Sequence, residues 1–120
     1  MYNMESPMLV LTSVGSEQQA IAIAEELIQQ ELVACVNILP TMRSIYRFKG
    51  KVFDDEENLL FIKTTRELFQ DVCDVISQMH TYEVPEIMGF NVDHFQNSFL
   101  NWVNEAVSGS RAISDQEIDH

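Results

Sequence analysis

The hydrophobic and polar residues of this chain follow two periods, one typical of strands and one typical of helices. Short apolar runs predict extended segments at 8–14, 32–39, 44–48, 51–53, 59–62 and 86–92. Apolar residues at helical spacing predict helices over 16–31, 64–79 and 95–106. The order is βαββαβ plus a C-terminal helix. It predicts an α+β, ferredoxin-like fold: one antiparallel sheet with the first two helices on one of its faces.

Local signals mark where these elements begin, turn and end. Ser16 with Gln19, and Thr64 with Glu67, have the spacing of capping boxes that open the first two helices. Pro85 cannot continue the second helix. Pro40 belongs on a sheet edge or at a bulge, because proline has no N–H to donate. The pair Lys49-Gly50 predicts a tight hairpin turn.

The segment from 34 to 63 predicts one unusually long β-hairpin. Each arm has about 15 residues and would reach roughly 50 Å if fully extended, whereas a helix of about 15 residues covers only about 22 Å. The tip, with Tyr46, Phe48 and Phe53, should therefore project beyond the helices. Exposed aromatic side chains next to an unpaired edge favour cover by another copy of the chain. Alternatively, the strand folds back at Pro40 and the aromatic side chains pack locally.

The length of 120 residues suits one domain. We expect a flexible N-terminus over 1–7, a folded domain over 8–107 and a disordered acidic tail over 108–120. The first residues lack the basic and apolar regions of a secretory signal, and no apolar run approaches the roughly 20 residues of a membrane helix. A cytoplasmic protein is expected, with its two cysteines as free thiols.

The formal net charge of −12 argues against polyanionic partners. Nucleic-acid affinity comes mainly from Lys and Arg side chains that neutralise phosphates, so DNA, RNA and anionic membranes are excluded as expected partners. Cations are better candidates, although such a charge can serve solubility alone.

The sequence offers no catalytic motif. Its four glycines are too far apart for a dinucleotide fingerprint or a P-loop, and no base is placed next to a nucleophile. We therefore expect a protein that is not an enzyme.

Metal ligands are more plausible. Cys35 offers a thiolate and His80 an imidazole, a pair that suits copper or zinc better than magnesium or calcium. Carboxylates are available at Glu57, Glu83 and Glu86. Each residue also has an ordinary interpretation. A cysteine in an apolar strand is often a small buried hydrophobe, an imidazole at a helix C-terminus can act as a cap, and the acidic stretch around Glu57 is typical of a solvated face.

Several of these residues together resemble the divalent-cation tolerance protein (CutA) family. The resemblance runs from Met8 to Val107 and rests on an ordered set of motifs: Ala34-Cys-Val-Asn-Ile38 with Pro40, Ser44-x-Tyr46, Gly50-Lys51, the acidic stretch, Lys63-Thr64 and His80-x-Tyr82-Glu-x-Pro85-Glu86. Two residues depart from the family pattern. Phe48 stands where the family usually has Trp, and Thr81 where it usually has Pro.

The resemblance implies a homotrimer in which the hairpin reaches onto a neighbouring subunit. The hairpin residues would be Tyr46, Phe48, Gly50 and Phe53. The architecture also resembles the nitrogen-regulatory signalling proteins, which are trimers that bind nucleotides and metabolites.

The same resemblance implies tolerance to divalent metals and a copper site, with zinc or another divalent metal as an alternative. The matching positions are Cys35, Glu57 and His80, near a cleft between subunits. Tyr82, Glu83, Glu86 and Lys63 are the further candidates for ligand binding in that cleft.

Two functions follow from the sequence. The first is a trimeric protein that binds copper or a similar divalent ion in metal homeostasis. The second is a signalling or scaffold trimer that binds a small metabolite or a protein partner between its subunits.

Overall fold

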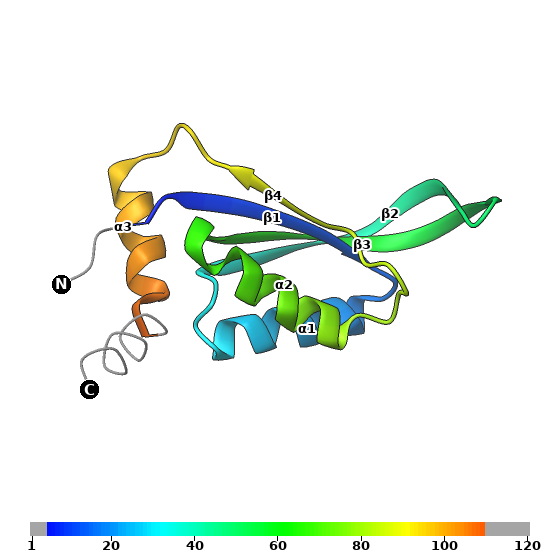
Figure 1. The fold of residues 1–120 in the computed structure, drawn as a ribbon, viewed down its shortest axis with the longest axis horizontal. Helices are drawn as coiled ribbons and strands as arrows, with labels where there is room; N and C mark the ends of the chain where they lie inside the picture. The colour runs from blue at the N-terminus through cyan, green and yellow to red at the C-terminus, as the bar shows by residue number, and fades with distance from the viewer. Residues whose placement is uncertain (1–4, 110–120) are drawn as a thin grey trace.

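The computed structural model describes residues 5–109. The elements are β1 (Pro7–Val14), α1 (Glu17–Gln29), β2 (Cys35–Phe48), β3 (Lys51–Thr65), η1 (Arg66–Leu68), α2 (Phe69–Met79), β4 (Ile87–Asn91) and α3 (Asn97–Ala106). The strands form one antiparallel sheet in the order β2-β3-β1-β4. Helices α1 and α2 lie together on one face of this sheet (Figure 1). The predicted α+β ferredoxin-like fold is confirmed.

The core lies between the sheet and helices α1 and α2. Strand residues of the helix-covered face, such as Val10 and Ile62, are fully buried and lie opposite each other in the register. The helices contribute Ile23, Leu27, Val72 and Ile76, which are also fully buried. Because strand side chains alternate between faces, the residues between these positions point to the other side of the sheet.

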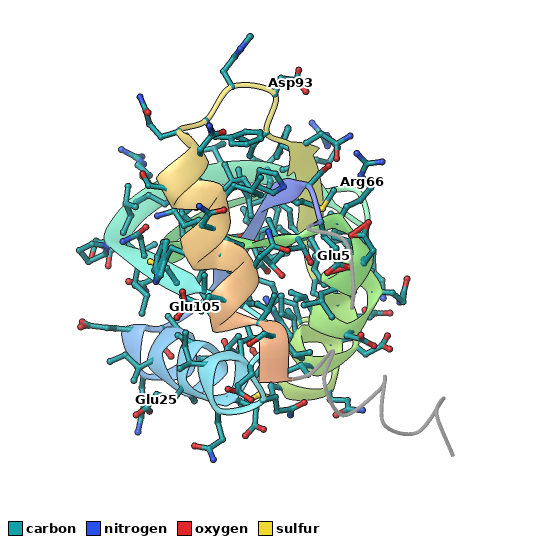
Figure 2. The ribbon with its side chains drawn as sticks, turned by 90° about the vertical axis from the view of Figure 1, so that its left-hand side faces the viewer. Glu5, Glu25, Arg66, Asp93 and Glu105 are labelled. Atoms are coloured by element: carbon teal, nitrogen blue, oxygen red, sulfur yellow. The ribbon has the colours of Figure 1, made fainter. Side chains whose placement is uncertain are left out.

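Helix α3 lies at the end of the sheet opposite the hairpin tip, and Figure 2 shows this end of the molecule with α3 in front. The Asn104 side chain accepts a hydrogen bond from the Glu5 backbone N–H (2.8 Å) and donates one to the Glu5 carbonyl (3.1 Å). These bonds connect the last helix to the start of the chain. The expected flexible N-terminus and acidic tail lie outside the described residues, apart from residues 5–7 and 108–109.

Of the two predicted capping boxes, the first is formed only in part. The Ser16 side chain accepts a hydrogen bond from the Gln19 N–H at 3.1 Å. The Gln19 side chain, however, donates to the Met79 carbonyl and so connects α1 to the end of α2. The prediction of a second capping box, formed by Thr64 and Glu67, is wrong. Thr64 is still inside β3, and its hydroxyl donates to the Leu32 carbonyl at 2.6 Å, so the chain enters α2 through the 3-10 turn η1.

The long hairpin is confirmed. Strands β2 and β3 pair from Cys35 opposite Lys63 to Phe48 opposite Lys51. The register shifts between Leu39 and Met42, which places Pro40 at an irregularity on an edge strand, as its missing N–H predicts.

The tip is the predicted tight turn. Lys49 and Gly50 both have positive φ angles, of 52° and 79°, as a two-residue turn matched to the strand twist requires.

The hairpin extends beyond the helices and gives the molecule a longest dimension of 51 Å (Figure 1). The strand does not fold back at Pro40. The aromatic side chains nevertheless make local contacts, because the Tyr46 and Phe53 rings stack with centroids 5.3 Å apart. The Lys49 ammonium lies 5.4 Å from the centre of the Phe48 ring. The alternative prediction is thus partly correct: the aromatic side chains pack locally, although the strand does not fold back.

Candidate functional site

A hollow of about 880 Å³ lies on the face of the sheet that the helices leave open. Its floor is formed by side chains of β1, β3 and β4, including Leu11, Ser13, Leu59 and Met88. One wall is the outer half of the β2–β3 hairpin. The other wall is the segment 81–86, which leads from α2 to β4. The long hairpin and the break at Pro85 are therefore the two sequence features that create the hollow.

Glu57 and Tyr82 meet at the inner wall of this hollow. Glu57 is only 5% exposed, and its carboxylate accepts a hydrogen bond from the Tyr82 hydroxyl at 2.8 Å. The interpretation of Glu57 as part of a solvated acidic face is thus wrong. Glu57 lies on β3 two residues before Leu59, on the open face, where the segment around Tyr82 covers it.

His80 and Ser13 hold the covering segment onto the sheet. The His80 Nε2 lies 2.7 Å from the Ser13 carbonyl oxygen, and the His80 Nδ1 lies 3.1 Å from the Tyr82 backbone N–H. The Ser13 hydroxyl donates to the Glu86 carboxylate at 3.4 Å. His80 is the C-cap residue of α2, as predicted, but its side chain binds β1 and not the helix carbonyls.

The surroundings raise the pKa values of two tyrosines. Burial raises the pKa of Tyr82 above its ordinary value, and the hydrogen bond and charge of Glu57 add to the effect. The hydrogen bond from Tyr46 to Asp55 (2.7 Å) raises the pKa of Tyr46 to about 12. Both hydroxyls are therefore neutral hydrogen-bond donors at physiological pH.

Cys35 and Lys63 lie at the other end of the open face. They are directly opposite each other in the register, and the Lys63 Nζ is 3.9 Å from the Cys35 Sγ. The Lys63 ammonium also contacts the Asn37 side chain. Lys63 lies six positions after Glu57 along β3, which corresponds to about 20 Å of extended strand. Within one chain, Cys35 and Glu57 cannot bind the same ion.

The predicted metal ligands therefore divide into two places. Glu57 lines the hollow, His80 lies beside it and holds the segment 81–86 to β1, and Cys35 lies at the root of the hairpin. Within residues 5–109, no three His, Cys, Asp or Glu side chains are grouped so that they could hold one ion.

The hydrogen bonds of His80 add a second obstacle. The Tyr82 backbone N–H can only donate, so the His80 Nδ1 accepts this hydrogen bond. The His80 Nε2 therefore carries the ring proton and donates to the Ser13 carbonyl oxygen. Both ring nitrogens are thus occupied. A complete copper site does not fit the residues of a single chain.

The remaining candidates line the hollow or its rim. Glu83 forms an ion pair with Lys49 of the hairpin tip at 2.9 Å, and Glu86 receives the bond from Ser13. The hairpin residues Tyr46, Phe48 and Phe53 contribute the aromatic part of the wall, and Gly50 lies in the turn beyond them. Ser13 was not predicted. The available signal was its place in the strand: Thr12 and Val14 point to the helices, so Ser13 between them points to the open face, where it too is buried.

These features define a ferredoxin-like protein whose open sheet face carries a hollow lined by carboxylates and aromatic rings. The family described as CutA1 divalent ion tolerance protein matches residues 8–106. The chain belongs to this family, which is named for tolerance of divalent ions and not for a catalysed reaction.

Known relatives agree with this assignment. The divalent-cation tolerance protein CutA of Thermus thermophilus is 40% identical over 97 residues, which are 81% of this chain and 94% of the relative. The chloroplastic protein CutA of Arabidopsis thaliana is 32% identical over 98 residues, 82% of this chain but only 54% of that protein. The crystal structure of divalent ion tolerance protein CutA1 from Ehrlichia chaffeensis superimposes with a TM-score of 0.83 at 27% identity. The match covers 88% of this chain and 98% of that one.

Proposed function

We propose that this chain forms a homotrimer that binds copper or a similar divalent ion and acts in metal homeostasis in the cytoplasm. The observation that carries the proposal is family membership over nearly the whole described region. Among the described residues, none of the helices is long and apolar enough to cross a membrane.

The open face of the sheet supports the trimer. Leu39, Met88 and Phe90 are more than 40% exposed on this face, and Leu9, Leu11 and Phe61 are only partly buried beside them. A contiguous apolar surface of this kind marks an interaction site. The edge strand β2 adds unpaired backbone groups along the hairpin. Like subunits in a closed ring can cover both features.

For the metal, we assign Cys35 as the first ligand, because it is a partly exposed free cysteine and sulfur is a soft ligand that suits copper and zinc. Further ligands would come from a second subunit, since Glu57 and His80 of the same chain are too distant. His80 can bind a metal only if its ring leaves one of its two hydrogen bonds. Replacing Cys35 should therefore weaken metal binding more than replacing His80.

This assignment can be tested by titrating Cu(I) and Cu(II) into Cys35→Ala and His80→Ala variants. Matched controls are Cys73→Ala, which removes the other free thiol, and His94→Ala, which removes another imidazole. We expect a lower affinity for Cys35→Ala and an unchanged affinity for both controls. If both Cys35→Ala and His80→Ala bind copper like the parent protein, the site assignment is wrong.

A second function is favoured by the hollow itself. A cavity of about 880 Å³ with aromatic walls has the size and lining of a small-molecule site. In this second proposal, the trimer is a signalling or scaffold protein that binds a small metabolite or a protein partner in the cleft. A ligand that binds only the native state raises the melting temperature, so thermal shift screening tests this function.

A further inference from the structure

We propose that the hairpin tip of one subunit docks on helix α3 of the next subunit. The inference rests on the proposed homotrimer and names the surface of each chain that receives its neighbour's hairpin. The tip is the segment 45–52, and the α3 surface consists of the side chains of Phe99, Trp102 and Glu105. The two surfaces are far apart in one chain, carry uncovered apolar side chains and have opposite charges.

The tip exposes large apolar side chains that its own chain does not cover. Ile45 is 66% exposed and Val52 is 61% exposed. Val52 is on the same face of β3 as the buried Leu60 and Ile62, and Ile45, which lies opposite Asp54, is on this face too. The helices cover Leu60 and Ile62, but the hairpin extends past the helices (Figure 1). The helix-side face of the tip is therefore a second uncovered surface, distinct from the open face of the sheet.

Helix α3 carries the other uncovered apolar surface. Trp102 is 45% exposed, and its ring centroid lies 5.9 Å from that of Phe99. Phe95, directly before the helix, is also exposed. Val103 and Val107 are fully buried, so another face of the helix already packs on the core. The exposed aromatic side chains are thus available to a second chain, and tryptophan is common among the residues that dominate interfaces.

The two surfaces carry opposite charges. Four of the seven Lys and Arg residues of the sequence lie within 43–51, and this segment has no Asp or Glu. Residues 67–109 contain no Lys or Arg, and the acidic residues on α3 and in the loop before it are Glu105 and Asp93 (Figure 2). Arg66, at the same end of the molecule, lies apart from α3 in this view. Opposite charges steer two surfaces together and fix their orientation.

The charges of both surfaces lack partners within the chain. Among residues 5–109, Lys51 forms neither a hydrogen bond nor an ion pair, and the Glu105 carboxylate forms no ion pair. Arg47 donates one hydrogen bond, to the Gly50 carbonyl at 3.3 Å. A cation from the tip, placed between the Trp102 ring and the Glu105 carboxylate, would form a cation–π contact and an ion pair together.

The tip and α3 cannot meet within one chain. They lie at opposite ends of the molecule, whose longest dimension is 51 Å (Figure 1). A contact between two different surfaces of identical chains is heterologous, and such contacts close into a ring when the rotation permits. Contact between the tip and α3 therefore suits a ring of three chains better than a two-fold dimer, which pairs one surface with itself.

A disulfide between the two surfaces tests the docking. Lys51→Cys and Glu105→Cys are introduced together into the full chain, and covalent species are separated by electrophoresis without reductant. The matched control combines Lys51→Cys with Glu17→Cys, which changes an exposed glutamate of α1. Both proteins keep the free thiols Cys35 and Cys73. We expect covalent dimers and trimers from the first pair and mainly monomers from the control. No cross-link in the first pair, or equal cross-linking in both, would overturn the inference.

Subunit exchange gives a second test that needs no new cysteine. Unlabelled and nitrogen-15-labelled proteins are mixed, and native mass spectrometry follows the mixed species. Trp102→Ala should exchange at least about tenfold faster than the parent protein, because loss of interface contacts mainly speeds dissociation. Lys51→Glu and Glu105→Lys should each exchange faster, whereas the two together should return toward the parent rate, since the charges attract again. Parent-like exchange of Trp102→Ala, or no rescue in the double variant, would overturn the inference.

The same spectra separate this docking from the proposed trimer. Trimers of the parent protein without a cross-link between the tip and α3 would contradict the docking alone. Specific cross-linking in a protein that does not form trimers would contradict the proposed trimer and leave the docking standing. A parent protein that stays monomeric and gives no cross-link would contradict both.

Discussion

The two faces of the sheet are made by the same strands but have opposite characters. On the helix-covered face, Val10, Leu60 and Ile62 are fully buried. On the open face, their neighbours Leu9, Leu11 and Phe61 are only partly buried, and the candidate residues Cys35 and Glu57 lie there too. One face is completed within the chain, whereas the other is not.

This difference assigns stability of the chain to one face of the sheet and assembly and binding to the other. The buried face contains what a single chain needs for its core. The open face exposes apolar side chains to water, which does not stabilise a single chain. Polar groups lie at both ends of this apolar surface, Cys35 with Lys63 at one end and Glu57 with Tyr82 at the other. The comparison predicts that substitutions on the covered face change the stability of the chain, while substitutions on the open face change assembly and binding.

The largest expected effect comes from Ile62→Ala on the covered face. Removing this fully buried side chain should lower the free energy of unfolding by about 2–5 kcal/mol, because it leaves a cavity in the core. Its matched variant is the neighbour Phe61→Ala, on the open face. Thermal unfolding and native mass spectrometry should show a large loss of stability for Ile62→Ala, and dissociation as the main effect of Phe61→Ala. Equal effects on both readouts would contradict the division between the faces.

Gly89→Ala tests how closely β4 approaches α2. A Cβ atom at Gly89 would lie 2.8 Å from the Phe69 ring and 3.0 Å from the Met8 sulfur, so one of them must move. We expect a loss of about 1–3 kcal/mol, typical of overpacking. Chemical denaturation measures it, with Met88→Ala on the open face as the control. A smaller loss for Gly89→Ala than for Met88→Ala would show that β4 does not pack tightly on the helix side.

Tyr82→Phe removes the one donor to Glu57 that residues 5–109 supply, and it should cost about 1–3 kcal/mol, because a buried carboxylate loses its hydrogen bond. Tyr46→Phe is the control. Its hydrogen-bond partner Asp55 is exposed, so this substitution should change the free energy of unfolding little. The raised pKa of Tyr82 means that its contribution is complete below about pH 10 and is lost as the pH rises above that value. Urea unfolding at neutral and alkaline pH would detect both effects, and identical behaviour of the two variants would contradict the role of Tyr82.

The smallest expected effect is a gain. Thr12 is fully buried on the covered face, and its hydroxyl has no hydrogen-bond partner among the described residues. Thr12→Val should leave stability unchanged or raise it by up to about 1 kcal/mol. Thr64→Val, also fully buried, should instead lose stability, because the Thr64 hydroxyl donates to Leu32. If Thr12→Val lowers the free energy of unfolding as much as Thr64→Val does, the Thr12 hydroxyl must form a hydrogen bond, which would contradict this prediction.

Most of the fold could be predicted from the sequence, because local patterns coincide with the tertiary structure. The helix start at Ser16, the turn at Lys49-Gly50 and the irregularity at Pro40 follow from backbone chemistry that each residue carries alone. Thr64 shows the limit. Its spacing to Glu67 is that of a cap, but pairing with β1 keeps it in the strand, where its hydroxyl meets the Leu32 carbonyl.

The site was less predictable, since it depends on contacts between distant segments. Glu57 belongs to a run of acidic residues, and only its position on β3 opposite the segment around Tyr82 buries it. His80 offered a free imidazole in the sequence, whereas both of its nitrogens are occupied in the fold. Cys35 and Glu57 are on the same face of the sheet, but their separation along β3 could be judged only from the register.

The central claim is that the open face of the sheet is covered by like subunits. Native mass spectrometry of the full chain at micromolar concentration tests it most directly. The account predicts a dominant species of three chains, which Phe61→Ala shifts toward monomers and Ile62→Ala, where folded, does not. A parent protein that stays monomeric at every concentration would contradict the claim.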